Sequence, residues 1–159
     1  MKRHGFTMIE LVFVIVVLGI LAAVALPKLG SSLKLAQISK AQGDVAAIRS
    51  AIASARQKLL VTGTNRYLST LDNSASTGNG QKLFDQNGTD AILNYPVYSK
   101  SSGGHWLKQA NLSGTVTKYK FSVDGTYTIF WYDSSDGGFD CHNADNTGDA
   151  LVNCKAIVE

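Results

Sequence analysis

The apolar residues of this chain are concentrated in one continuous stretch near the N-terminus. Residues 6–26 contain a single charged side chain, Glu10, and follow a short basic segment at residues 2–4. A helix rises 1.5 Å per residue, so this stretch would span about 30 Å, the thickness of a bilayer core. The pattern fits three possibilities. These are a plain membrane anchor, a secretory signal cut at Ala25, and a signal that is cut before the apolar stretch so that the stretch stays on the protein.

An amphipathic helix pattern follows and predicts that the helix continues over residues 28–61. Apolar residues recur every seven positions, with others between them: Ile38, Val45, Ile52 and Leu59, then Ala41, Ile48 and Ala55. The charged residues fall mainly off this stripe: Lys40, Asp44, Arg49, Arg56 and Lys58. A stripe this narrow is typical of a helix that packs on a sheet. Pro27 is expected to kink the helix at the membrane edge, and Gly63 is expected to end it.

The rest of the chain predicts a globular head with a small antiparallel sheet. Residues 69–90 read as a polar loop, in which 15 of 22 residues are Ser, Thr, Asn, Asp or Gly. Residues 115–132 form two β-prone runs joined by Asp124-Gly125, which is the strongest short hairpin signal. The apolar face of the first run is predicted to lie on the helix stripe: Thr117, Tyr119, Phe121 and Val123.

A hairpin alone is marginally stable, so a third strand is expected beside it. Residues 91–98 and 154–158 are the candidates, and Pro96 indicates that the first of them is short or lies at an edge.

The N-terminus carries a specific motif, and Glu10 is its most informative residue. A carboxylate within an apolar span is costly, and a disposable signal or a simple anchor gains nothing from it. Gly5-Phe6-Thr7-Met8-Ile9-Glu10-Leu11, followed by the apolar stretch and Pro27, resembles the N-terminus of type IV pilins and type II secretion pseudopilins over residues 1–30. The resemblance implies a cut between Gly5 and Phe6 by a prepilin peptidase, and methylation of the new amine on Phe6.

In the mature chain this chemistry would place a cation and an anion inside lipid. Unpaired, both the Phe6 amine and the Glu10 carboxylate are costly there. In a stack of offset subunits, Glu10 of one copy can meet the Phe6 amine of the next, which makes both residues candidates for filament assembly. A pair within one chain is the alternative, because the first helical turn brings the two groups near each other.

The resemblance also implies an α+β, pilin-like fold in the form of a lollipop, in which a long N-terminal helix packs on a small antiparallel sheet. The expected parts are a leader at 1–5, a transmembrane and assembly helix at 6–27, an amphipathic half at 28–61 and a head at 62–159. Pilin-like proteins commonly pin their C-terminal region with a disulfide, and an exported head favours oxidation. We therefore expect a disulfide between Cys141 and Cys154.

Metal and modification sites are weaker hypotheses. A zinc site would need Cys141, Cys154 and His142, with His105 as a fourth ligand, but adjacent Cys and His have poor zinc spacing. Calcium candidates are Asp133, Asp136 and Asp140, in a segment that departs from the EF-hand pattern. Asn87 and Asn111 stand in N-x-[ST] acceptor motifs. No cofactor is expected.

The charges are divided unevenly along the chain. Residues 1–120 carry 14 basic and 5 acidic side chains, whereas residues 121–159 carry 1 basic and 7 acidic ones. Residues 28–120, with 12 basic and 4 acidic side chains, could contact a nucleic-acid backbone, with Tyr95, Tyr98, Trp106 and Tyr119 as stacking groups. The favoured interpretation is that this basic surface contacts the acidic residues 121–159 of a neighbouring subunit.

No catalytic constellation or G-x-S-x-G motif stands in the sequence, so an enzyme is not expected. The favoured function is a structural subunit, a prepilin of a type IV pilus-like filament held in the inner membrane with its head in the periplasm. Its expected partners are copies of itself or other pilins, prepilin peptidase, an inner-membrane assembly platform and membrane lipid. The alternatives are a pseudopilin of a type II secretion or DNA-uptake apparatus, and an anchored exported binding module.

Overall fold

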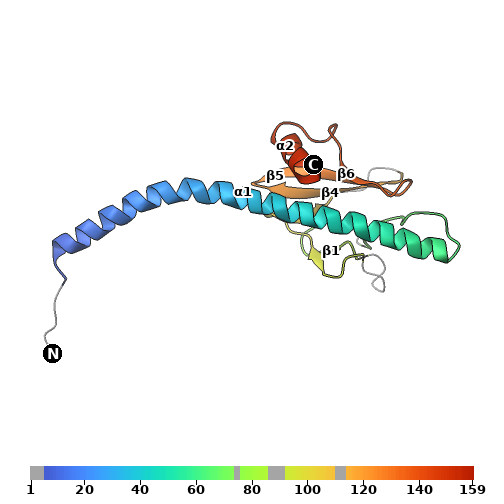
Figure 1. The fold of residues 1–159 in the computed structure, drawn as a ribbon, viewed down its shortest axis with the longest axis horizontal. Coiled ribbons are helices and arrows are strands. Elements are labelled where there is room, and N and C mark those ends of the chain that lie inside the picture. The colour runs from blue at the N-terminus through green and yellow to red at the C-terminus, as the bar shows by residue number, and fades with distance from the viewer. Residues whose placement is uncertain (1–5, 74–75, 86–91, 110–113) are drawn as a thin grey trace, which may run out of the picture. The chain divides into compact units, whose positions relative to one another are not determined.

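The structure, a computed structural model, describes residues 6–73, 76–85, 92–109 and 114–159. Two compact units divide the chain, residues 1–35 and residues 36–159, and the second is called the head below. The elements in chain order are α1 (Met8–Val61), β1 (Lys82–Leu83), β2 (Val97–Tyr98), β3 (Trp106–Lys108), β4 (Val116–Val123), β5 (Thr126–Asp133), β6 (Phe139–Cys141) and α2 (Asp149–Val158) (Figure 1). A long N-terminal helix, an antiparallel sheet and a C-terminal disulfide make up the predicted α+β, pilin-like fold, which is confirmed.

Helix α1 supplies both the apolar stem and one wall of the head. Its assignment runs through Pro27 without a break. Within the head, the middle of the predicted stripe is almost fully buried: Ala41, Val45, Ile48 and Ile52 are at most 3% exposed. The helix ends after Val61 as predicted, because Gly63 adopts a φ of 79° and the Thr64 N–H donates to the Leu59 carbonyl over 2.8 Å.

Asp44 departs from the predicted pattern, because it lies on the buried side of α1 and is only 8% exposed. Its carboxylate accepts hydrogen bonds from the Trp106 indole N–H at 2.9 Å and from the Tyr95 hydroxyl at 3.2 Å. These hydrogen bonds compensate the burial of the charge. The position of Asp44 along the helix does not reveal these bonding partners.

The predicted hairpin is confirmed as the centre of a four-stranded antiparallel sheet with the order β3-β4-β5-β6. Val123 of β4 pairs with Thr126 of β5. The two residues between them have positive φ, 49° for Asp124 and 79° for Gly125, as a tight hairpin turn requires. The sequence therefore predicts the hairpin but not its two flanking strands.

The two candidate third strands have different outcomes. Residues 154–158 are not a strand but the end of α2, and that prediction is wrong. Residues 91–98 contribute only β2, a two-residue strand that pairs with β1 outside the main sheet, as Pro96 indicated. Strand β1 itself lies inside the segment that was read as a polar loop.

The core of the head lies between α1 and one face of the sheet. It combines the α1 stripe with Tyr119, Phe121 and Val123 of β4, which confirms the predicted packing face. Trp106 of β3 is fully buried, with its ring 5.0 Å from that of Phe121.

Helix α2 packs against β5, and its Ile157 joins the same core as the α1 stripe. Cys141 of β6 and Cys154 of α2 form the predicted disulfide, with their Cα atoms 6.0 Å apart. Asn146 lies in the segment that the disulfide closes. Its side chain accepts from the Ile129 N–H at 2.8 Å and donates to the Ile129 carbonyl at 2.9 Å, so it binds β5 much as a neighbouring strand would.

Candidate assembly site

The N-terminal half of α1 has an exposed surface that a water-soluble helix would not present. Every large apolar side chain from residue 6 to residue 35 is at least 37% exposed, with Phe13 at 69% and Ile9 at 77%. This helix is long and apolar enough to cross a membrane, and none of its most apolar part is buried. A helix that is hydrophobic all round is buried in lipid or among other helices.

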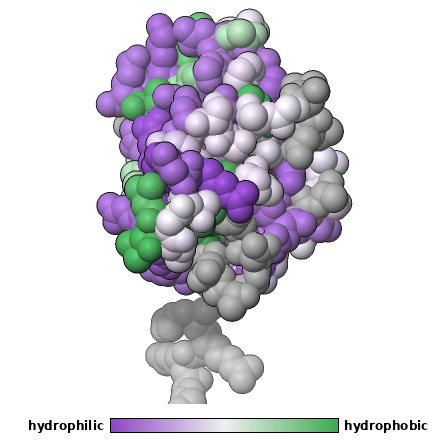
Figure 2. Space-filling model, turned by 90° about the vertical axis from the view of Figure 1, so that its right-hand side faces the viewer, coloured by the Kyte–Doolittle hydropathy of each residue, from purple (hydrophilic) through white to green (hydrophobic). Residues whose placement is uncertain are grey.

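The far end of the head has a different surface. Figure 2 looks at the end where α1 finishes and shows a mostly hydrophilic face with small, separate hydrophobic patches. Exposed apolar side chains at this end of α1 are Leu60 and Val61. Among the described residues, the exposed large apolar side chains are therefore continuous over residues 6–35, and at this end of the head they are few and separate.

Glu10 and Thr7 form a reciprocal cap at the first turn of α1. The Glu10 carboxylate accepts from the Thr7 N–H at 2.9 Å and from the Thr7 hydroxyl at 2.8 Å, both at Oε2. The Thr7 hydroxyl oxygen in turn accepts from the Glu10 N–H at 3.3 Å. This arrangement is a capping box. Its Thr-x-x-Glu spacing is the sequence signal that predicts it.

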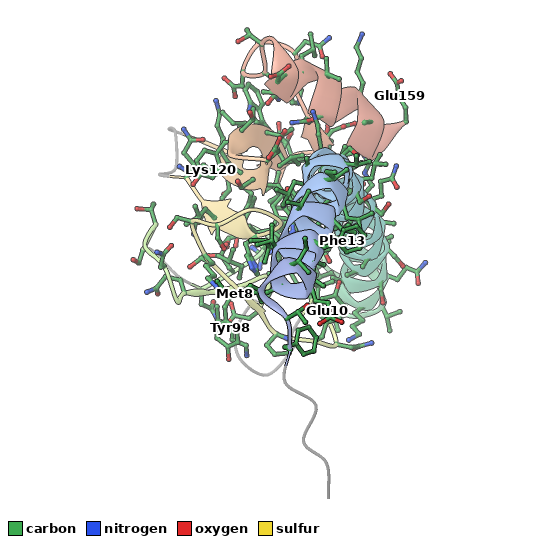
Figure 3. All side chains as sticks on the ribbon, turned by 90° about the vertical axis from the view of Figure 1, so that its left-hand side faces the viewer. Met8, Glu10, Phe13, Tyr98, Lys120 and Glu159 are labelled. Atoms are coloured by element: carbon green, nitrogen blue, oxygen red, sulfur yellow. A yellow bond between two sulfur atoms is a disulfide. The ribbon has the colours of Figure 1, made fainter. Side chains whose placement is uncertain are left out.

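The side chain of Glu10 is exposed at the tip of α1, near Phe13 (Figure 3). Phe6 is 81% exposed. Gly5 lies outside the described residues, so the cut between Gly5 and Phe6 and the methylation of Phe6 stay predictions. The kink at Pro27 is likewise a prediction. In a single chain, then, the Glu10 carboxylate has one described role, which is to cap its own helix.

The calcium candidates bind backbone groups in their own turns. Asp133 accepts from the Ser135 N–H at 2.8 Å, which lowers the pKa of its carboxyl group. Asp136 accepts from the Gly138 N–H at 2.7 Å, and Asp140 lies 3.2 Å from the Arg49 guanidinium. Across the described ranges, no three His, Cys, Asp or Glu side chains gather as a metal site would require.

The other candidate sites are altered by burial or by bonding. Cys141 and Cys154 are joined to each other, so neither is available as a zinc thiolate. Trp106 and Tyr119 are fully buried and cannot stack on a nucleic-acid base, whereas Tyr95 and Tyr98 are 46% and 55% exposed. The glycosylation candidates Asn87 and Asn111 lie outside the described residues.

One buried polar cluster gave no signal in the sequence. The Lys108 ammonium lies 2.7 Å from Oδ1 of Asp72, and the Tyr119 hydroxyl donates to Oδ2 of the same carboxylate. The side chains of Lys108 and Asp72 are 6% and 0% exposed. Lys108 and Tyr119 are cross-strand partners on β3 and β4, so the sheet aligns two of the three members.

Comparison with known proteins places the similarity mainly at the N-terminus. Residues 1–26 match the family model for the prokaryotic N-terminal methylation motif. The chain is 43% identical over 51 residues to the type II secretion system core protein G of Pseudomonas aeruginosa, which covers 32% of this chain and 36% of that protein. It is 41% identical over 53 residues to a fimbrial protein of Pseudomonas aeruginosa, about a third of each chain.

A longer similarity extends into the head. The chain is 26% identical over 145 residues to the type IV major fimbrial protein FimA of Dichelobacter nodosus, which covers 87% of each protein. No solved structure matches the chain significantly. The resemblance that the N-terminal motif indicated is therefore confirmed.

Proposed function

We propose that this chain, which is type IV pilin-like or type II secretion pseudopilin-like, is a structural subunit of a type IV pilus-like filament. Its head would lie in the periplasm before assembly, and its apolar stem would lie in the inner membrane. Prepilin peptidase and the inner-membrane assembly platform would be its processing partners. The similarity to structural pilins fits a protein that is not an enzyme.

One observation carries the proposal: a carboxylate stands at the tip of a helix whose apolar surface is exposed on all sides. The stem needs a non-aqueous environment, which either lipid or neighbouring stems can supply. A charged side chain costs about 2.5–3.5 kcal/mol at the middle of a bilayer on insertion scales and less near a helix end, and either cost favours a partner for Glu10. In the proposed filament that partner is the Phe6 amine of an adjoining copy.

The chemistry of the pair follows from a cut between Gly5 and Phe6. The cut removes the basic leader and leaves a cationic amine one residue before Thr7. In low dielectric, an amine and a carboxylate in contact stabilise each other strongly, and removal of one partner leaves an uncompensated charge. The stem would thus be held in register by a single charge pair within an apolar bundle.

A pilus subunit is favoured over a pseudopilin because the alignment with a major fimbrial protein extends through the head. That alignment spans 145 residues, whereas the alignments with core protein G span 51 and 96 residues. The second candidate is a pseudopilin of a secretion or DNA-uptake apparatus, which shares the same N-terminus. Filaments on the cell surface would support the first candidate. Filaments confined to the periplasm would support the second.

The capping box allows the charge of Glu10 to be tested separately from its role as a cap. Glu10→Gln keeps an amide oxygen that can accept from Thr7, since Gln serves as well as Glu in this box, but it removes the charge. Glu10→Ala removes both, and Thr7→Val removes the hydroxyl alone. We expect normal processing and membrane insertion in all three variants, and a large loss of sheared filaments in Glu10→Gln and Glu10→Ala but not in Thr7→Val.

Two readouts keep the test decisive. Intact mass of the membrane form should match a chain that begins at Phe6, and loss of residues 1–25 would point to a secretory signal and reject the proposal. If Glu10→Gln assembles as well as the wild type while Glu10→Ala does not, the cap and not the charge pair supports assembly. If both variants assemble normally, the inter-subunit pair is wrong.

A further inference from the structure

The head has a basic, aromatic side and an acidic side that face away from each other. Figure 3 looks along α1 and shows Tyr98 and Lys120 on one side of the head, with Glu159 of the α2 end on the other. All three residues belong to the compact unit 36–159. The end of α2 therefore lies on the other side of the head from Tyr98 and Lys120.

The basic side contains a hollow of about 580 Å³ between α1 and the segment around β2. Its apolar walls include Tyr95, Pro96 and Tyr98, and Trp106 lies beneath them. Tyr95 and Tyr98 are 46% and 55% exposed, although both are large rings. The Tyr95 hydroxyl donates to the Asp44 carboxylate at 3.2 Å, which fixes that ring at the edge of the hollow.

Two lysines and one histidine line this hollow: Lys40, Lys100 and His105. Burial first, and then the Lys40 and Lys100 ammonium groups, lower the pKa of His105. The Asp44 carboxylate also lines the hollow, but it is buried and already accepts from Tyr95 and Trp106. The hollow therefore offers apolar walls with positive charge at their edge.

The outer face of α2 has the complementary arrangement. Its inner face is buried through Ala150, Asn153, Cys154 and Ile157. The outer face carries Asp149, Val152, Ala156 and Glu159, which recur at helical spacing and are all exposed. Val152 is 61% exposed, and the two carboxylates flank it along the helix. An apolar residue between acidic ones matches an apolar hollow with a basic edge, and one cation, Lys155, lies beside it.

We infer that the tyrosine-lined hollow of one copy receives the outer face of α2 from a neighbouring copy of this chain. The inference rests on the proposed filament and adds the head-to-head contact to it. Because the two surfaces differ and lie on opposite sides, the contact is heterologous and repeats from copy to copy without closing, as a filament requires. Val152 fills the hollow, while Asp149 and Glu159 meet Lys40 and Lys100.

Cysteine pairing in assembled filaments tests the contact. The full-length chain with Tyr98→Cys and Val152→Cys together, oxidised mildly in sheared filaments, should give a ladder of dimers, trimers and higher multimers on a non-reducing gel. Either change alone should give no ladder, because each copy then offers one side only. Val61→Cys is the matched control for Val152→Cys, since Val61 is 89% exposed at the end of α1 and should not pair with Tyr98→Cys.

Charge exchange gives a second test that needs no added cysteine. Lys100→Glu should reduce filament number several-fold, and Glu159→Lys in the same chain should restore it, because the pair is then re-formed with its signs reversed. Exposed pairs are individually weak, so the rescue and not the size of the loss is the informative result.

The outcomes separate this inference from the proposed function. Wild-type filaments with neither ladder nor rescue overturn the contact and leave the filament intact, whereas a wild-type chain that forms no filaments overturns both. A disulfide-linked dimer from Val152→Cys alone would show a self-paired contact and also overturn it. If Lys100→Glu instead leaves filaments unchanged and abolishes salt-sensitive binding of a single-stranded DNA oligomer, the hollow serves nucleic acid.

Discussion

Removal of the Asp72 carboxylate should unfold the head more readily than any surface change. Asp72 is fully buried beside Lys108, whose ammonium lies 2.7 Å from Oδ1, and Tyr119 donates to Oδ2. Asp72→Ala would leave the Lys108 cation without this carboxylate, at a side chain that is only 6% exposed. Breaking a buried pair from one side costs about 3–5 kcal/mol, because the charge that stays behind loses its oppositely charged partner.

The expected change is large enough for a thermal assay. A domain of this size loses about 4 °C of melting temperature per kcal/mol, so Asp72→Ala should lower Tm by about 12–20 °C. The full-length chain in detergent can be followed by near-ultraviolet circular dichroism, because Trp106 and Trp131 both lie in the sheet. The apolar stem contributes no Trp to this signal.

Two further variants distinguish the charge from the packing. Tyr119→Phe removes one hydrogen bond to a charged group and should cost about 1.5–3 kcal/mol. Asp72→Leu combined with Lys108→Met removes both charges and should recover much of the loss, since apolar replacement of a whole buried pair is often neutral or stabilising. A shift below about 4 °C for Asp72→Ala would refute the reasoning, because the pair would then contribute no more than an exposed one.

Two other predictions concern the C-terminal region. Cys154→Ser opens the loop closed by Cys141 and should cost about 3 kcal/mol in the chain-entropy model, measured as the same Tm shift; two free thiols in non-reduced wild-type protein would contradict the bond. The hydrogen bond from Lys118 lowers the pKa of Asp145, so its folded value lies below the unfolded value of about 3.9 and its stabilisation is lost as pH falls through that range. Asp145→Asn should therefore lower Tm at pH 6 and flatten its decline between pH 5 and pH 3, and an unchanged pH profile would contradict the pair.

The sequence predicts the elements whose information is local. The α1 stripe and the β4–β5 hairpin were both predicted, because a helical period and a turn dipeptide are read within a few residues. Residues 154–158 were assigned to the wrong element because the apolar run was taken by itself. Extended backward, Ala150, Cys154 and Ile157 stand four and three residues apart, which is helical spacing on one buried face.

The burial of charged residues could not be predicted from local sequence patterns. Asp44, Asp72, Lys108 and Lys118 were all expected at the surface or gave no signal, yet each is at most 8% exposed. The partners of Asp72 lie 36 and 47 positions away along the chain, so no local window contains them. Charged side chains are rarely buried without a partner, and only the fold determines which partner is near.

The N-terminal site differs from these clusters, because its functional partner lies outside the single chain. The motif marks Phe6 and Glu10, but among the described residues of one copy Glu10 binds Thr7, through Oε2. In the mature chain an amine would stand next to the Thr7 N–H, so the cap and the charge pair would draw on the same carboxylate. In water neither the Thr7 cap nor the charge pair is strongly favoured, whereas in lipid every unpaired charge is costly. The proposed pairing should therefore form where the stems meet. Until then, Thr7 should keep the Glu10 carboxylate hydrogen-bonded.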